Sequence, residues 1–275
     1  MAESKVWFIT GCSTGFGREI AKKVILEGYK VVVTARNMAQ IENLSPDNEN
    51  VLVLKLDVTD KNQVREAVNQ TIVKFGRIDV LVNNAGIGYF SSVEESIEEE
   101  TRKMFEINFW GLMNVTNEVL PHFRSQKSGH IINLSSISGL ASSPAVGYYN
   151  ATKYAVEGIS ESLAEEVAVA GIKVTLIEPS SFRTDWAGRS ANRTQTTISE
   201  YKGTVGKRID QPSGQEAGDP KKLADSVLAV AESEKPPLRL LLGGDAYEIA
   251  TKKFTTLLNE IEDWKETTIS ADFKE

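Results

Sequence analysis

The centre of the chain carries three residues whose types and spacing suit proton transfer: Ser136, Tyr149 and Lys153. Tyr149 and Lys153 form the only Tyr-x-x-x-Lys of the chain, and Ser136 lies thirteen residues before the tyrosine. The segment 151–169 has helical periodicity, so the phenol and the ammonium share one helix face, where the ammonium lowers the phenol's pKa. A hydroxyl beside such a pair suits proton transfer to a carbonyl oxygen. The alternative is that both side chains only pack a helix against a sheet.

A glycine-rich segment near the N-terminus stands between a short apolar run and a stretch of helical periodicity. It reads Thr10-Gly11-Cys12-Ser13-Thr14-Gly15-Phe16-Gly17. The order strand, glycine turn and helix predicts a phosphate cradle, because glycines let the backbone approach a pyrophosphate whose charge meets free N–H groups. A tight turn without a ligand is the alternative. The predicted cofactor contacts here are Gly11, Ser13, Gly15, Phe16 and Gly17, and Cys12 is interpreted as a small filler.

Arg36 follows the next apolar run, at the distance from the glycines where dinucleotide folds contact the adenosine ribose. A carboxylate there would accept hydrogen bonds from a free 2′-hydroxyl, whereas an arginine pairs with a 2′-phosphate. The sequence therefore favours NADP (NADPH) as cofactor over NAD. An exposed arginine without a ligand is the alternative, and Arg18 is a second candidate for the same contact.

Short β-branched runs alternate with longer helical segments, which is typical of βαβ units and a parallel sheet. The predicted strands are 6–10, 30–35, 51–55, 80–83, 130–135, 173–178 and 239–242. We expect an α/β fold, a doubly wound Rossmann-type parallel seven-stranded sheet with helices on both faces, in one domain over 1–275. Two helix starts are predicted: a capping box at Ser96 and Glu99, and Asp219 before Pro220. The acidic run 94–100 is interpreted as solvated carboxylates at a helix start.

The segment from about 180 to 218 is rich in Gly, Ser, Thr and Arg and poor in hydrophobic periodicity. Long loops inside a compact domain are usually lids or binding loops, so it is predicted to cover the substrate. An apolar substrate is predicted from the residues expected at the rim: Ile87, Tyr89, Phe90, Leu140, Ala141, Val146, Phe182 and Trp186. Core packing is the alternative for each of them, and Arg183, Arg189 and Arg193 could instead attract an anionic group.

Composition excludes several classes of function. The net charge of −7 makes nucleic acid an unexpected partner. One cysteine and two histidines cannot build a disulfide framework or a zinc cluster, so no metal is expected. No apolar run approaches the length of a membrane span, and a cytoplasmic protein without a membrane or targeting segment is the expectation.

Taken together, the motifs resemble those of the short-chain dehydrogenase/reductase family, in its single-domain branch. Residues 10–17 resemble its TGxxxGxG loop, 83–86 its NNAG segment, and Ser136, Tyr149 and Lys153 its Ser/YxxxK set. The resemblance implies that Asn108 acts with these three as a catalytic residue by holding a water in a proton relay. It also implies cofactor contacts by Asp57, Val58, Asn83, Ala85, Gly86, Tyr149, Lys153, Pro179 and Thr184. The family commonly has Pro-Gly where this chain has Pro179-Ser180, which could alter the start of the covering segment.

The resemblance implies an NADP-dependent oxidoreductase that moves a hydride between nicotinamide and a carbonyl or secondary alcohol. Tyr149 is then the acid or base, Lys153 depresses its pKa and holds the ribose, and Ser136 binds the substrate oxygen. A non-catalytic NADP sensor or scaffold on the same fold is the alternative, and a nucleotide-sugar epimerase fits the glycine spacing poorly. A homodimer or homotetramer is expected through the segment 109–123 and the helix after Tyr149, unless those residues pack within the chain.

Overall fold

The computed structural model describes residues 4–44, 48–184, 186, 188, 190–212 and 214–273. The main sheet is parallel throughout, in the strand order β3-β2-β1-β4-β6-β7-β9. Its strands are β1 (Val6–Ile9), β2 (Lys30–Ala35), β3 (Val51–Lys55), β4 (Val80–Asn83), β6 (Gly129–Leu134), β7 (Ile172–Pro179) and β9 (Arg239–Leu242). The predicted Rossmann-type sheet is confirmed, with each strand end within one residue of its prediction.

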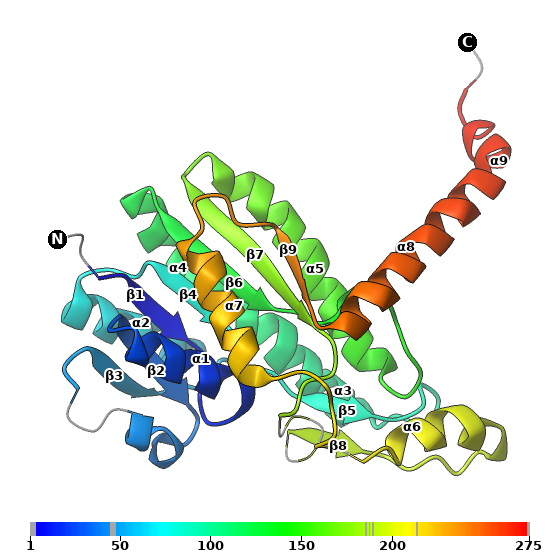
Figure 1. Ribbon diagram of the computed structural model, residues 1–275, viewed down its shortest axis with the longest axis horizontal. Helices are drawn as coiled ribbons and strands as arrows, with labels where there is room; N and C mark the ends of the chain where they lie inside the picture. Colours follow the sequence, from blue (N-terminus) through cyan, green and yellow to red (C-terminus); the bar gives the residue numbers. More distant parts are fainter. Residues whose placement is uncertain are drawn as a thin grey trace.

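Helices cover both faces of this sheet (Figure 1). On one face lie α1 (Gly15–Leu26) and α7 (Pro220–Glu232), and on the other α2 (Lys61–Phe75), α4 (Leu112–Gln126) and α5 (Gly147–Ala168). Successive side chains of a strand alternate between the faces. Trp7 and Ile9 of β1 accordingly pack with the first pair of helices, and Phe8 packs with the second group.

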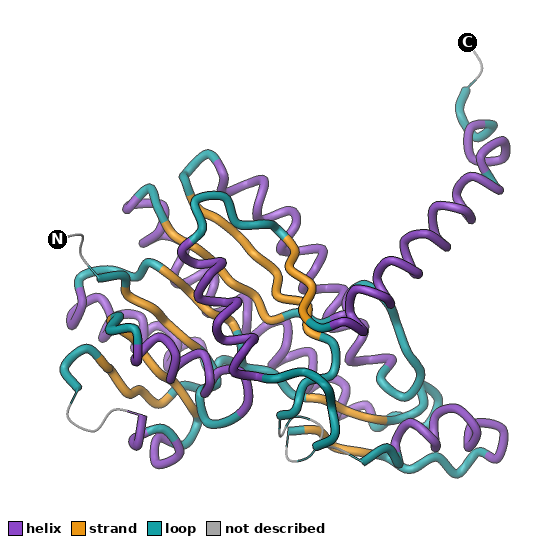
Figure 2. Tube along the Cα trace, in the orientation of Figure 1, coloured by secondary structure: helices purple, strands orange, loops and turns teal. Residues whose placement is uncertain are grey.

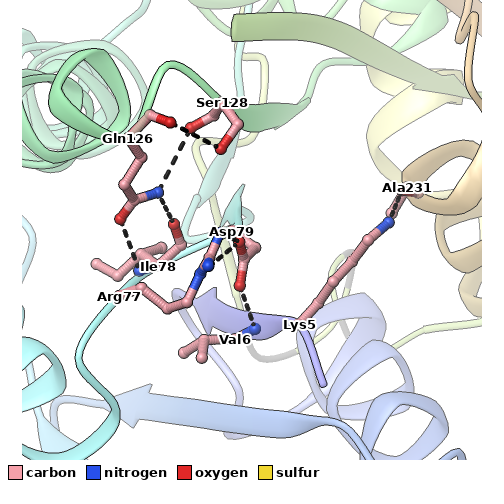
Figure 3. Close-up of polar contacts among 8 residues, drawn as sticks. All are labelled: Lys5, Val6, Arg77, Ile78, Asp79, Gln126, Ser128 and Ala231. Atoms are coloured by element: carbon pink, nitrogen blue, oxygen red, sulfur yellow. Dashed lines mark hydrogen bonds and ion pairs between the residues drawn. The ribbon is translucent and has the colours of Figure 1, made fainter. Parts of the chain in front are cut away.

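The amino ends of the strands are held together by side chains from the connecting loops (Figure 3). Asp79, just before β4, accepts hydrogen bonds from the Val6 N–H at 2.8 Å and from the Arg77 guanidinium at 2.9 and 2.6 Å. The Gln126 side chain donates to the Ile78 carbonyl at 2.7 Å. Charged and amide groups therefore fix this edge, which is the opposite edge from the carboxyl ends of the strands.

The two helix-start predictions have different outcomes. Asp219 caps α7 as predicted, with Pro220 in the first turn. The capping box at Ser96 is wrong, because α3 (Glu98–Phe105) begins later, with Ile97 at its N-cap. The Ser96 hydroxyl instead donates to a carbonyl three residues before it. Between α3 and α4 lies η3 (Glu106–Gly111), a π-helical segment of the kind often found at functional sites.

A second, two-stranded parallel sheet lies outside the main sheet and is absent from the sequence predictions. It pairs β5 (Gly88–Phe90) with β8 (Ala191–Arg193), so the covering segment is joined to the loop after β4. The remaining short elements are η1 (Met38–Gln40), η2 (Glu42–Leu44), η4 (Ile137–Gly139), η5 (Ser199–Tyr201), η6 (Lys202–Gly206) and α6 (Lys207–Ile209). The covering segment therefore carries structure of its own.

The carboxylate of Glu95 is one of the groups that attach the covering segment to the rest of the molecule, beside those of Glu94 and Glu100. It accepts hydrogen bonds from the hydroxyl of Thr196 at 2.6 Å, from the N–H and hydroxyl of Thr197 at 2.7 and 2.9 Å, and from the Ile198 N–H at 3.3 Å. Hydrogen bonds from Thr196, Ser92 and Thr197 lower the pKa of Glu95 to about 2. The sequence suggested that the carboxylates of the acidic run 94–100 only face water. The structure shows that at least Glu95 instead binds another segment of the chain.

The chain ends in α8 (Gly244–Asp263) and α9 (Lys265–Ile269). Figure 2 shows α8 leaving the sheet and helices as an arm that carries α9 at its outer end. Among the described residues, no helix combines the length and apolarity needed to cross a membrane.

Candidate functional site

The glycine loop lies at the carboxyl edge of the sheet, where β1 and β4 are neighbours and the strand order reverses. Gly11 and Gly15 have positive φ angles of 71° and 59°. A Cβ at Gly17 would lie 2.3 Å from Nδ2 of Asn84 and 2.4 Å from the carbonyl oxygen of Gly11. The loop therefore requires glycine for both conformation and close approach.

Asn84 holds this loop, and sequence reasoning did not single it out. Its side-chain amide donates to the carbonyls of Thr10 and Gly11 at 2.8 and 3.0 Å. The N–H groups of Asn84 and Ala85 both donate to the Thr10 hydroxyl, at 2.9 and 3.0 Å. The only sign of this role in the sequence is that Asn84 is the second asparagine of the NNAG segment.

The loop fits a dinucleotide phosphate on the chain's own chemistry. The N-cap of α1, Thr14, makes no side-chain capping bond, and the first turn of the helix carries no acidic residue. First-turn N–H groups and the helix dipole are thus available to an anion, and no carboxylate of the first turn competes for them. A Cβ at Gly15 would meet only Thr184, at 3.8 Å, so space remains above the loop. Cys12 is buried, and burial raises its pKa to about 12, in keeping with a filler.

Other predicted cofactor residues lie along the same edge. Arg36 is exposed directly after β2, and Arg18 donates to Gln40 and Asn43 in the turns that follow. Asp57 accepts from the N–H and hydroxyl of Thr59 at 3.0 and 2.7 Å, so its carboxylate forms a local turn.

The side chains of two more predicted contacts are packed inside the fold. Val58 is buried, and a Cβ added at Gly111 would lie 2.5 Å from it. The Asn83 amide donates to the Thr116 hydroxyl and to Oδ1 of Asn133, both at 2.9 Å. The Asn83 side-chain nitrogen thus joins β4 to α4 and β6, while its side-chain oxygen is buried without a hydrogen-bond partner.

Ser136 and Tyr149 come together as the sequence predicts. Ser136 caps η4 after β6, and its hydroxyl lies 3.4 Å from the carbonyl oxygen of Pro179. Tyr149 stands in the first turn of α5. Burial raises the pKa of Tyr149 to about 12, while a hydrogen bond with Ser136 acts in the opposite direction.

Lys153 lies one turn beyond Tyr149, with its Nζ 5.7 Å from the centroid of the tyrosine ring. The ammonium donates to the Leu134 carbonyl at 2.6 Å. Burial lowers the pKa of Lys153 to about 8, against the raising effect of the Glu157 charge. Burial has the larger effect on the Tyr149 phenol and raises its pKa, and the expectation that Lys153 depresses this pKa stays a prediction.

Asn108 lies in the π-helical segment η3, where it reaches both the loop after β4 and α5. Its Oδ1 accepts from the Ile87 N–H at 2.8 Å, and its Nδ2 donates to the Ile87 carbonyl at 2.9 Å and to the Thr152 hydroxyl at 3.2 Å. Thr152 precedes Lys153, so Asn108 binds the residue next to one of the predicted catalytic side chains.

A buried carboxyl pair lies behind Lys153. Glu178 of β7 is fully buried, and Glu157 of α5 is nearly so. The Arg239 Nε lies 3.0 Å from Glu157 Oε2 and 3.6 Å from Glu178 Oε1, so one guanidinium faces two carboxyl groups. Burial and the charge of Glu157 raise the pKa of Glu178 to about 8. Glu178 therefore retains a proton at neutral pH.

The start of the covering segment lies over the glycine loop and the tyrosine. Phe182 meets Phe16 edge to face at 5.4 Å between ring centroids, and Thr184 lies above Gly15. Trp186 lies 4.8 Å from Tyr149, centroid to centroid. A Cβ at Gly88 would lie 2.4 Å from the Trp186 ring, so the glycine of β5 makes room for the indole. Arg189 lies outside the described residues.

The serine at position 180 does not strain the chain. Among the described non-glycine residues, only Lys127 and Ala145 have positive φ, so this position does not require glycine. The Ser180 hydroxyl instead lies against Gly243, where an added Cβ would come within 2.3 Å of it. Gly243 therefore accommodates the side chain of Ser180, and the expected effect on the start of the covering segment stays a prediction.

Comparison with known proteins agrees with this geometry. A model of the short chain dehydrogenase family matches residues 5–195. An oxidoreductase of Botryotinia fuckeliana, BOA17, is 42% identical over 98% of this chain and 99% of its own length. A 3-ketodihydrosphingosine reductase of Bacteroides thetaiotaomicron is 36% identical over 88% of each chain.

Solved structures are similar as well. A short-chain dehydrogenase from Streptomyces avermitilis has a TM-score of 0.92 and 37% identity, over 99% of this chain and 100% of its own. ElxO with NADP bound has a TM-score of 0.75 and 29% identity, covering 90% and 100%. A 3-ketoacyl-(acyl-carrier-protein) reductase from Brucella melitensis complexed with NADH has a TM-score of 0.74 and 28% identity, over 89% of this chain and 99% of its own. Through its sheet, its glycine loop and these relatives, the chain belongs to the short-chain dehydrogenase family and is an oxidoreductase of that family.

Proposed function

We propose that the protein is an NADP(H)-dependent reductase of carbonyl groups, or a dehydrogenase of the matching secondary alcohols. The observation that carries this proposal is the meeting of Ser136 and Tyr149 above the carboxyl edge of the sheet, with the Lys153 ammonium beside them. These groups stand next to a glycine loop suited to a dinucleotide phosphate. A proton donor, a second hydroxyl and a cation at one place are what carbonyl reduction needs.

In the direction of reduction, the glycine loop and Arg36 would hold NADPH, which would supply the hydride that the carbonyl carbon receives. Tyr149 gives its phenolic proton to the carbonyl oxygen, which leaves an alcohol and a phenolate. The Ser136 hydroxyl hydrogen-bonds the same oxygen and holds it toward the phenol. Lys153 stabilises the phenolate through its charge, because the ammonium is buried, the phenol is partly buried and the local dielectric is low.

The preference for NADP is proposed from Arg36. It stands exposed after β2, at the place where the family of folds contacts the adenosine ribose. A guanidinium there forms charge-assisted hydrogen bonds with a 2′-phosphate, and no carboxylate occupies the position to accept from a 2′-hydroxyl. Asp57, the nearby acid after β3, is engaged by Thr59.

A largely apolar substrate is proposed from the surroundings of Tyr149. Phe90, Val146 and Trp186 form one hydrophobic cluster with the tyrosine ring. The Arg193 guanidinium lies 4.9 Å from the centre of the Phe90 ring, so one of the arginines near the site is stacked on an aromatic face. Arg183 donates to the Glu216 carbonyl at 3.0 Å within the covering segment. Apolar walls with few polar groups favour neutral ligands.

The test is turnover of NADPH and NADH with neutral ketones and aldehydes, and with carboxylated analogues of the same size. We expect oxidation of NADPH with neutral apolar carbonyl compounds, at higher kcat/KM than with NADH. Preference for the carboxylated analogues would contradict the apolar site. Absence of turnover with every carbonyl compound, in a protein that binds NADPH, would favour a sensor.

Self-association through α4 and α5 is a further part of the proposal. Trp110, at the end of η3, and Tyr154, on α5, are exposed large side chains on this side of the fold. Light scattering that finds only the 30.2 kDa species at working concentration would contradict it.

A further inference from the structure

The arm formed by α8 carries an apolar stripe that begins on the body of the protein and continues beyond it. Ala246 and Ala250, in its first turns, are buried, and α8 contacts β9 and η4 there. Every residue from 251 to 273 is exposed. Figure 1 shows α8, drawn in orange, running away from the sheet and its covering helices.

The stripe has the spacing of a helix that packs against another helix. From Ala250 onward, apolar residues recur at steps of four and three: Phe254, Leu257, Ile261 and Trp264. This period of 3.5 residues is that of a coiled-coil seam. The exposed fractions are 45% for Phe254, 39% for Leu257, 56% for Ile261 and 66% for Trp264. Contiguous exposed apolar side chains of this size mark an interaction surface.

The charges of the arm indicate which partner covers the stripe. Lys252 and Lys253 begin the free part of α8, while its outer part carries Glu260, Glu262, Asp263 and Glu266 against one cation, Lys265, which is paired with Glu262 at 2.9 Å, and is therefore acidic on balance. Two arms packed antiparallel bring the basic start of each opposite the acidic half of the other, whereas parallel arms bring acid against acid. The acidic residues also oppose binding to an anionic membrane.

We propose that the stripe 254–264 packs antiparallel against the same stripe of a second copy of this chain, around a two-fold axis. An identical patch on both copies, with charges that complement each other under that rotation, is what an isologous contact requires. Leu257 of each copy then contacts Ile261 of the other, and Phe254 contacts Trp264. This contact is separate from self-association through α4 and α5, since it uses a different element.

The first test compares the oligomeric mass of the full chain with that of Leu257→Glu/Ile261→Glu. Four carboxylates at the helix crossing should weaken association at least tenfold and lower the sedimenting mass. Thr256→Glu/Asn259→Glu, with the same charge on the opposite face of α8, should leave the mass unchanged. Circular dichroism checks that both variants fold. Equal masses for the unmodified protein and the Leu257/Ile261 variant would overturn the proposal.

The second test reads the orientation through disulfide formation, with a clean background because the single cysteine, Cys12, is buried. A mixture of the Leu257→Cys and Ile261→Cys proteins should form cross-linked dimers more efficiently than either protein alone. Preferential linking within each single variant would indicate parallel arms and overturn the antiparallel contact. Flotation with phosphatidylcholine–phosphatidylserine vesicles, if lost in Leu257→Glu/Ile261→Glu and found without self-association, would assign the stripe to lipid instead.

Discussion

At the scale of single residues, Tyr149 combines two opposing influences on its acidity. Burial favours the protonated phenol, which is the form that donates, while the hydrogen bond with Ser136 favours the phenolate. A residue held protonated until its proton is needed is suited to work as an acid.

Tyr149→Phe should reduce kcat by about 10²–10⁴-fold, because it removes the proposed general acid and little else. NADPH affinity, followed by fluorescence titration, should change by less than about threefold. Tyr148→Phe deletes the same hydroxyl from the neighbouring residue and is the matched control, with activity retained. A folded Tyr149→Phe protein turning over at the parent rate would refute the mechanism.

Arg36→Asp should shift cofactor preference toward NADH, since it removes the partner of a 2′-phosphate and adds an acceptor for a ribose hydroxyl. The ratio of kcat/KM for NADPH to that for NADH should fall by at least about tenfold, or 1.4 kcal/mol. Arg18→Ala is the companion variant. An unchanged ratio in Arg36→Asp together with a lowered one in Arg18→Ala would move the phosphate contact to Arg18.

Glu178 provides an expected pH dependence of stability. Its pKa is raised from 4.5 to about 8 in the folded protein. The native state therefore holds a proton that the unfolded chain releases, and stability declines as the pH rises from about 4.5 to 8. Glu178→Gln removes this dependence. The difference between the Tm of the variant and the Tm of the parent should therefore shift in favour of the variant as the pH rises over that interval, and become constant above it.

The control for Glu178 is Glu161→Gln, which loses a partner of the same Arg239 guanidinium at an exposed position. Its Tm difference from the parent should stay nearly constant over the same interval of pH. A constant difference for Glu178→Gln as well would show that its carboxyl group is ionised in the folded state.

Sequence spacing could find Ser136, Tyr149 and Lys153 because their chemistry depends on a local pattern. It could not find Glu95, whose partners lie about a hundred residues further along the chain. The sequence did not indicate the role of Asn84 for a different reason. Its side chain donates to carbonyls of the glycine loop, which only the fold brings close to it. Contacts between distant segments are decided by tertiary packing and leave no periodicity in the sequence.

At the scale of elements, the turn between β1 and α1 depends on the lack of a side chain at Gly17. Gly17→Ala places a Cβ against Asn84 and the Gly11 carbonyl, so the loop must shift. NADPH affinity should fall by at least about tenfold in a fluorescence titration, because the N–H groups no longer point at one place.

Gly158→Ala is the control for this loop. It lies within α5, and an added Cβ meets nothing within 4 Å. Alanine in a helix interior is preferred over glycine, so stability should rise by about 0.5–1 kcal/mol with unchanged affinity. Unaltered NADPH binding by a folded Gly17→Ala protein would contradict the proposed cradle.

Most strands of the main sheet were predictable because they are apolar runs buried on both faces, which leave a continuous apolar signal, and the half-buried β9 is still a run of leucines. The three-residue strands β5 and β8 are too short to give such a signal, and they pair across a long separation in the sequence. The capping box at Ser96 failed because its hydroxyl has a carbonyl partner upstream. Local signals predict an element only where no tertiary contact competes for the same group.

At the scale of the whole molecule, the two edges of the main sheet have different roles. The carboxyl edge carries the residues proposed for chemistry, and the amino edge carries hydrogen bonds that join strand to strand (Figure 3). Changes at the amino edge should therefore affect stability without affecting the reaction.

Asp79→Ala should lower the free energy of unfolding by about 2 kcal/mol, because it strands the Val6 N–H and the Arg77 guanidinium. At a temperature where the variant is folded, kcat should remain within about twofold of the parent. Urea titration and steady-state kinetics on one preparation measure both quantities. A large loss of kcat without loss of stability would connect this edge to the site.

The attachment of the covering segment through Glu95 makes the protein suited to engineering by exchange. The Glu95 carboxylate is bound by two hydroxyls and two backbone N–H groups of residues 196–198, and backbone groups are present whatever the side chains are. Libraries that vary Trp186 and its neighbours while keeping Glu95, Thr196 and Thr197 would change the wall facing the substrate and leave its support in place. New substrate ranges can then be sought without rebuilding the sheet that carries the residues proposed for chemistry.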